Sequence, residues 1–160
     1  MYKSLCFITE KLNNFSFENL HYERQNEEYE GTTFSINTHT FRSRLAKSTP
    51  KKKGYFVAFW EKDITDKNQP FLYENSPDKL IITILDGQLS GQFIFPKEVL
   101  LKKGILKSKT SNGKMAMRIY PTWVHDLNKT AARTQEWQME HFIDTSITVD
   151  KKMFNALYFE

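Results

Sequence analysis

The segment LIITIL, residues 80–85, constrains the fold more than any other part of this 160-residue chain. It is continuously apolar and rich in β-branched residues, which predicts a strand at the centre of a sheet. Asp86 and Gly87 follow as a turn signal, and GQFIF, residues 91–95, predicts the strand that returns beside it. A buried hairpin therefore forms the expected centre of the fold.

The remaining pattern predicts helices and strands around this hairpin. We expect helices over residues 2–13, after Pro96, over 129–141 and after Asp150, and strands over 32–37, from Thr40, over 55–61, 114–119 and 147–149. This order predicts one α+β (mixed α/β) domain, residues 1–160, with a twisted, largely antiparallel or mixed sheet flanked by helices.

Composition excludes several classes of protein. A single cysteine, Cys6, rules out an internal disulfide framework and a cysteine-based zinc site within one chain. No segment approaches the roughly 18 consecutive apolar residues of a membrane helix, and the amino terminus lacks the order of a signal peptide. We therefore expect a soluble, cytoplasmic protein without a membrane partner. The net charge of +4 is too small to identify a partner by itself.

The distribution of basic residues is more informative. In the strand from Thr40, Arg42 and Arg44 alternate with apolar or small neighbours, which predicts that both arginines face outward. A lysine-rich loop follows, and a later strand carries two more cations on one face. Such a surface fits nucleic acid, double-stranded DNA above all, and the residues expected to contact phosphates are Arg42, Arg44, Lys47, Lys51, Lys53, Lys114 and Arg118. The alternative is an ordinary solvated surface, with the arginines paired to Glu27, Glu28 or Glu30.

Several segments resemble the MepB family in sequence and in order. They are YEG at 29–31, AKSTPKKKGYFVAFWEKD at 46–63, NQPF at 68–71, GQFIFPKEVLLKKGIL at 91–106, GKMAMRIYPTW at 113–123 and TAARTQEWQ at 130–138. The resemblance covers about residues 20–144; the helix at 2–13 and the extension at 145–160 add little to it. The family takes its name from an operon that encodes a multidrug efflux pump and its repressor, which implies a drug-responsive or protein-binding accessory role as one alternative.

The element order is also similar to that of restriction-endonuclease-like folds. A nuclease of that type carries a Pro-Asp pair and a following Glu-x-Lys; the acids hold Mg²⁺ and the lysine helps to position the attacking water. Pro77-Asp78 is present here, but the next strand carries no Glu-x-Lys, so Glu61, Asp78 and Asp86 are only weak catalytic candidates. Magnesium is expected only if the protein is a nuclease, and no glycine-rich phosphate loop points to another cofactor.

Together these patterns predict a DNA-binding protein that contacts phosphates without sequence specificity and without catalysis. A Mg²⁺-dependent nuclease and an efflux-linked accessory protein are the alternatives. The sequence predicts neither an oligomeric state nor a preference between DNA and RNA.

Overall fold

Strand β8 (Lys79–Asp86) lies at the centre of a six-stranded sheet in the computed structural model, which describes residues 1–13 and 15–160. It pairs in parallel with β3 (His39–Leu45) and in antiparallel fashion with β9 (Leu89–Pro96). Residues 80–84 are all buried, since both faces of the sheet are covered. The central hairpin predicted from LIITIL and GQFIF is confirmed.

The sheet order is β1-β2-β3-β8-β9-β11, with β1 (Glu18–Tyr22) and β11 (Phe142–Asp144) at its edges. Strand β2 (Thr32–Ile36) forms the predicted hairpin with β3. Every pairing in this sheet except β3–β8 is antiparallel. The prediction of a mixed, largely antiparallel sheet in one α+β domain is therefore confirmed.

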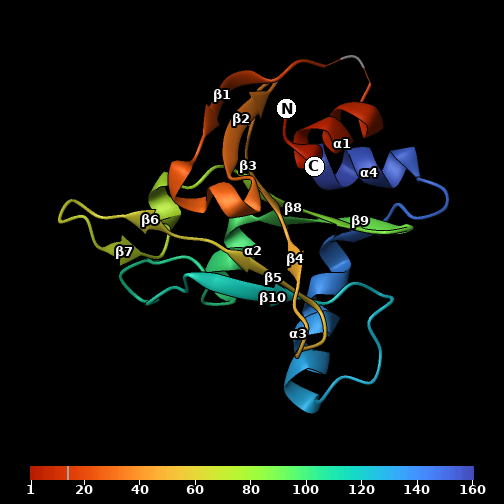
Figure 1. Ribbon diagram of the computed structural model, residues 1–160. Coiled ribbons are helices and arrows are strands. Elements are labelled where there is room, and N and C mark those ends of the chain that lie inside the picture. Colours follow the sequence, from red (N-terminus) through yellow and green to blue (C-terminus); the bar gives the residue numbers. More distant parts are fainter. Residues whose placement is uncertain (14) are drawn as a thin grey trace.

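Two helices cover one face of this sheet. Helices α1 (Lys3–Lys11) and α4 (Lys151–Phe159), near the two ends of the chain, lie on the same side of the sheet (Figure 1). Asp150 caps α4 by accepting a hydrogen bond from the Met153 amide, as its position before the helix predicts. The core on this side includes Leu5, Ile8, Phe34, Ile36, Phe41, Ile81, Ile94, Phe154 and Tyr158.

A second, smaller sheet covers the opposite face. Its order is β10-β5-β4, formed by Ala116–Ile119, Tyr55–Ala58 and Lys47–Ser48. The chain passes from β3 through the buried Ala46 directly into β4, so the strand that leaves one sheet enters the other. The core between the sheets includes Val57, Phe59, Phe71, Leu80, Ile82, Ile84, Phe93, Phe95 and Ile119. Both faces of the six-stranded sheet are thus covered over residues 80–84 of β8.

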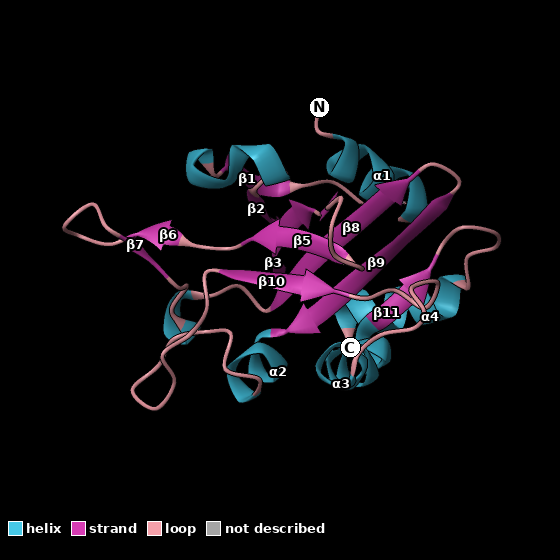
Figure 2. Ribbon diagram, turned by 60° about the horizontal axis from the view of Figure 1, so that its bottom comes forward, coloured by secondary structure: helices cyan, strands magenta, loops and turns pink. Residues whose placement is uncertain are grey.

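The remaining elements lie at the periphery. Helix α2 (Lys97–Lys102) follows β9, and α3 (Lys129–Gln138) continues into the 3-10 turn η3 (Met139–His141). A two-stranded ribbon of β6 (Glu61–Lys62) and β7 (Asn68–Gln69) projects from the body (Figure 2). Two further 3-10 turns are η1 (Arg24–Tyr29) and η2 (Tyr73–Asn75).

One predicted element is wrong. Residues 147–149 do not form a strand; the chain turns at Ser146, whose amide donates to the Asp144 carboxylate, and Ile147 is fully exposed. The last strand of the sheet lies earlier, at β11, where Phe142 and Ile143 are buried. Of the described residues, none belongs to a helix long and apolar enough to cross a membrane.

Candidate nucleic-acid interface

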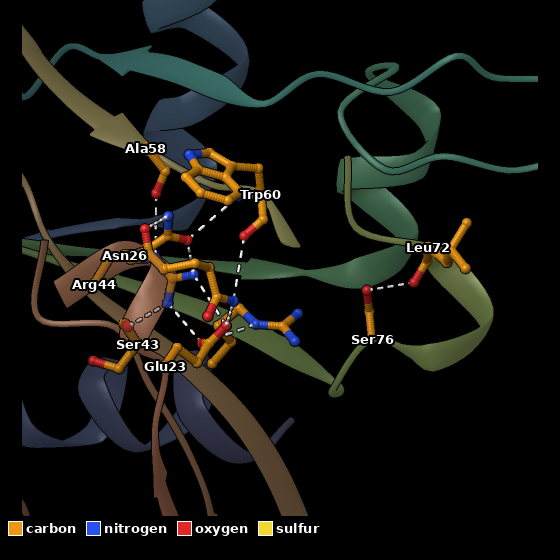
Figure 3. A network of polar contacts seen from close by, with 10 residues as sticks. Glu23, Asn26, Ser43, Arg44, Ala58, Trp60, Leu72 and Ser76 are labelled. Carbon is orange, nitrogen blue, oxygen red and sulfur yellow. Dashed lines mark hydrogen bonds and ion pairs between the residues drawn. The ribbon is translucent and has the colours of Figure 1, made fainter. Parts of the chain in front are cut away.

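Arg44 lies between the two sheets and has no exposed surface. Its guanidinium donates to both carboxylate oxygens of Glu23, to the side-chain oxygen of Asn26 and to the backbone oxygens of Ser43 and Ala58 (Figure 3). The shortest bonds are 2.6 Å to Asn26 and 2.8 Å to Glu23. Because a guanidinium carries five N–H donors, each donor of Arg44 has an acceptor.

Arg42 is also turned inward. Its Nε donates to Glu23 at 3.2 Å, its guanidinium carbon lies 3.6 Å from the centroid of the Phe71 ring, and its side chain is only 12% exposed. Burial lowers the pKa of the Arg42 guanidinium, and the Glu23 carboxylate opposes that shift. The prediction that Arg42 and Arg44 face outward is wrong, because the smaller sheet and the segment around η1 cover this face of β3.

Lys47 is exposed on β4 and lies beside η1. Its Nζ is 3.6 Å from a carboxylate oxygen of Glu28 and 4.7 Å from the centroid of the Tyr29 ring. The alternative expectation paired Arg42 and Arg44 with Glu27, Glu28 or Glu30, but the glutamate at 28 pairs with Lys47 instead. The arginines pair with Glu23, which that alternative did not include.

Arg118 on β10 fastens the loop of residues 49–53, hereafter the lysine loop. Its guanidinium donates to the Thr49 hydroxyl at 2.7 Å and to the Lys53 carbonyl at 2.9 Å. These hydrogen bonds hold the backbone of the lysine loop against β10.

Lys53 ties the other side of the lysine loop to the segment before α3. Its Nζ donates to the carbonyls of His125 and Asp126 at 2.9 and 3.0 Å. Of the loop lysines, Lys51 and Lys52 are exposed and form no ion pair within the part of the chain that the structure describes, and the same holds for Lys114 before β10.

Gln138 holds α3 against the free edge of β10. Its side-chain amide donates to the Arg118 carbonyl and accepts from the Tyr120 amide, both at 3.0 Å, as a neighbouring strand would. Gln138 is only 1% exposed. The helix is thus fixed beside the strand that carries Arg118.

Three cavities surround α3 and share lining residues. The α2–α3 cavity has a volume of about 690 Å³, the β10–α3 cavity about 350 Å³, and the lysine-loop cavity, at the start of α3, about 500 Å³. Their cationic lining residues are Lys51, Lys52, Lys53, Lys102, Lys103, Lys114, Arg118 and Arg133. Their carboxylates are Asp126, Glu136 and Glu140. Cations therefore dominate the walls.

Four of the seven residues predicted to contact nucleic acid line these cavities, namely Lys51, Lys53, Lys114 and Arg118. Sequence reasoning did not select Lys102, Lys103 and Arg133. The two lysines lie at the end of α2. Lysines are common at helix C-termini, so their presence there did not indicate a binding site. Arg133 lies next to Trp137 by one helical turn, a spacing that was available in the sequence.

The acidic candidates are not gathered at one place. Asp78 precedes β8 and its carboxylate accepts a hydrogen bond from the Thr40 amide, whereas Asp86 ends β8 and accepts from the Tyr55 hydroxyl at 2.7 Å. The two carboxylates therefore lie at opposite ends of an eight-residue strand. Burial and the bond to Asp86 raise the pKa of Tyr55 to about 12.

Glu61 lies apart from both, on the projecting ribbon near Arg42. It accepts a hydrogen bond from Gln69, and burial raises the pKa of its carboxyl group while the Arg42 charge opposes the rise. Among the described residues, no group of three histidine, cysteine, aspartate or glutamate side chains is placed to hold a metal ion. The geometry thus brings cations together and keeps the candidate catalytic acids separate.

Comparisons with known proteins agree with this fold. A family model described as MepB-like matches residues 23–144. No curated protein matches the chain. A solved structure described as the crystal structure of MepB is 46% identical, with a TM-score of 0.83, and the match covers 92% of this chain and all of that one. The chain therefore belongs to the MepB-like family.

Proposed function

We propose that this protein binds nucleic acid through the phosphate backbone, with duplex DNA as the first ligand to test. The surface is the set of cavities around α3. The observation that carries the proposal is the group of exposed cations on their walls that have no carboxylate partner among the described residues: Lys51, Lys52, Lys102, Lys103, Lys114 and Arg133.

Unpaired cations matter here because a phosphate need not displace a carboxylate in order to bind them. A lysine already paired with a carboxylate gains little from a phosphate, since one ionic contact replaces another. An exposed lysine without a partner releases counterions from the nucleic acid when it binds, which favours association. Arg42, Arg44 and Lys47 have acidic partners, whereas the cations around α3 form no ion pair with any carboxylate of residues 1–13 and 15–160.

The lysine loop is also held in place before any ligand arrives. Arg118 and Lys53 together fix it to β10 and to the segment before α3. Less conformational entropy is then lost when Lys51 and Lys52 meet phosphates. In this proposal Arg118 and Lys53 position the loop, and the neighbouring lysines make the contacts.

Fluorescence anisotropy of a labelled duplex of about 25 base pairs, titrated between about 50 and 200 mM salt, tests the proposal. With about five phosphates neutralised, log K falls against log[salt] with a slope of about −4 to −5, which is roughly a 500-fold loss of affinity across that range. Absence of binding at the lowest salt would overturn the proposal.

A matched pair of triple variants tests the location. Lys51→Ala, Lys52→Ala and Lys114→Ala remove three charges beside α3, and Lys3→Ala, Lys151→Ala and Lys152→Ala remove three exposed charges from α1 and α4 on the opposite face of the sheet. The first set should reduce the magnitude of the salt slope by about 2–3 and the second should leave it unchanged. Equal losses in both sets would assign binding to net charge alone.

Glu61, Asp78 and Asp86 lie apart from one another, so their positions do not support the nuclease alternative. A drug-responsive accessory role stays a prediction from the family resemblance. A thermal shift with cationic efflux substrates tests it, since a ligand in excess of its Kd raises the melting temperature.

A further inference from the structure

Trp137 stands between two of the cavities around α3. It lines both the α2–α3 cavity and the β10–α3 cavity, together with Lys103 and Thr134. The indole is half-buried, so part of a large aromatic surface faces these cavities. The exposed part of the indole therefore forms a flat apolar wall that a ligand in either cavity can contact.

The contacts of Trp137 differ in kind. One is with Phe95 of the core, at 5.4 Å between ring centroids and 48° between planes, which fixes the indole from inside. The other is with Lys103, whose Nζ lies 5.4 Å from the centroid of the indole. Lys103 is exposed and carries a flexible side chain, so a flat ligand can displace its ammonium group at small cost. The indole is thus anchored on the protein side and covered loosely on the cavity side.

The charges around the indole fit an aromatic ligand that is also an anion. Arg133 lies one helical turn before Trp137, on the same side of α3, and Lys102 lines the same cavity. Two carboxylates, Glu136 and Glu140, line it as well, and carboxylates accept hydrogen bonds from exocyclic amino groups. Volumes of about 350 and 690 Å³ lie in the range of sites for molecules the size of a nucleotide.

We propose that Trp137 is the stacking platform for an unpaired nucleobase, with Lys102, Lys103 and Arg133 on the flanking phosphates. This inference rests on the proposed function and adds to it a subsite that reads the base rather than the backbone. When a base stacks on the indole, the Lys103 ammonium moves from the ring to a phosphate. A base paired inside a duplex offers no free face, so the subsite acts on strand ends, flipped bases or single strands.

Two single-stranded oligonucleotides of about 12 nucleotides and equal charge test the inference: oligothymidylate, and its abasic counterpart with tetrahydrofuran in place of each nucleoside. Stacking on one aromatic residue is worth roughly 5- to 150-fold in affinity per base, so the wild-type protein should bind the oligothymidylate tighter by about that factor. Trp137→Ala should remove the difference and leave the affinity for the abasic strand unchanged. Trp137→Phe should restore part of it.

Tryptophan fluorescence supplies a second readout that does not depend on an alanine variant folding. Oligothymidylate should quench part of the wild-type emission, and that part should be missing in Trp137→Phe. Trp60→Phe is the matched control, because a lysine, Lys62, also lies over the Trp60 ring, at 5.5 Å, yet Trp60 lines none of the cavities around α3. It should lose none of the ligand-induced quenching.

The outcomes separate the two proposals. Equal affinity of the wild-type protein for both strands would overturn the stacking site and leave phosphate binding in place. A preference for oligothymidylate that persists in Trp137→Ala would place the base elsewhere. Failure to bind either strand at low salt would count against the proposed function and the stacking site together.

Discussion

The guanidinium of Arg44 and the carboxylate of Glu23, 21 residues apart in the chain, meet at 2.8 Å beneath the smaller sheet. The same carboxylate also accepts from Arg42, so one acid neutralises part of the charge of two inward-facing arginines. The Glu23 side chain is only 11% exposed. This arrangement joins η1 to β3 and fixes the entry of the chain into the second sheet.

Replacing Glu23 should therefore be costly. Glu23→Ala leaves two buried or nearly buried cations without their shared carboxylate, and breaking a buried pair in this way costs about 3–5 kcal/mol. Urea unfolding followed by circular dichroism measures the loss. Arg24→Ala removes a neighbouring exposed charge as the control and should change the free energy of unfolding by less than about 0.5 kcal/mol. A Glu23→Ala loss as small as that of the control would mean that water or relaxation replaces the pair.

Most elements of the fold were predictable from local patterns. The apolar run at β8, the alternation in β2 and β3, and the cap before α4 each determine local structure through neighbouring residues, and all three are present. The strands β1, β4, β6, β7 and β11 were not predicted, because short or polar strands carry no periodic signal of their own.

The orientation of Arg42 and Arg44 could not be predicted in the same way. Alternation along a strand separates two faces but does not say whether a second layer covers the polar one. Here the smaller sheet covers it, and the partner that makes burial tolerable, Glu23, lies on another segment. The lysine loop was found because its charges are consecutive in sequence. Its relation to Arg133 and Lys103 depends on where α2 and α3 pack, which is a tertiary property.

Glu61 gives a prediction on pH. Its pKa is raised in the folded protein above the ordinary 4.5, so the folded state binds its proton more tightly than the unfolded state does. The charged carboxylate is consequently unfavourable in the folded state at neutral pH. As the pH falls through the raised pKa towards 4.5, the folded state takes up the proton before the unfolded state does, and the free energy of unfolding increases. We expect Glu61→Gln to raise the free energy of unfolding at neutral pH and to have a shrinking effect in acid. A destabilised variant at neutral pH would show that the attraction to Arg42 dominates.

Gln138 gives a prediction on the edge of the smaller sheet. Gln138→Ala leaves the Arg118 carbonyl and the Tyr120 amide without their partner, and two such losses cost about 2–4 kcal/mol. Chemical denaturation measures the change, with Glu136→Ala on the exposed side of the same helix as the control. If both variants unfold at the same urea concentration, water replaces the glutamine amide at this edge.

Tyr55 gives a prediction on titration. Its pKa of about 12, against the ordinary 10.0, means that the stability it contributes is present below pH 10.0 and is lost as pH rises through about 12. The difference between rapid pH-jump absorbance titrations of the wild-type protein and Tyr55→Phe isolates this phenol. The rise in phenolate absorbance that the wild-type protein shows and Tyr55→Phe lacks should lie near pH 12. A missing step near pH 10 would mean that the hydroxyl has left Asp86 in solution.

The division of labour in the lysine loop gives a prediction that separates contact from positioning. Lys51 is exposed and forms no ion pair in the described part of the chain, whereas Arg118 donates to Thr49 and to the Lys53 carbonyl. Lys51→Ala should reduce the magnitude of the salt slope for duplex DNA by about 0.9, one phosphate contact.

Arg118→Gln should weaken binding at every salt concentration and leave the slope unchanged, because the loop loses its anchor while its phosphate contacts stay the same in number. Anisotropy titrations at four salt concentrations distinguish the two effects, with Lys3→Ala on α1 as the control that changes neither. A slope reduced by about 0.9 in Arg118→Gln would show that this guanidinium leaves the loop carbonyls and contacts a phosphate itself.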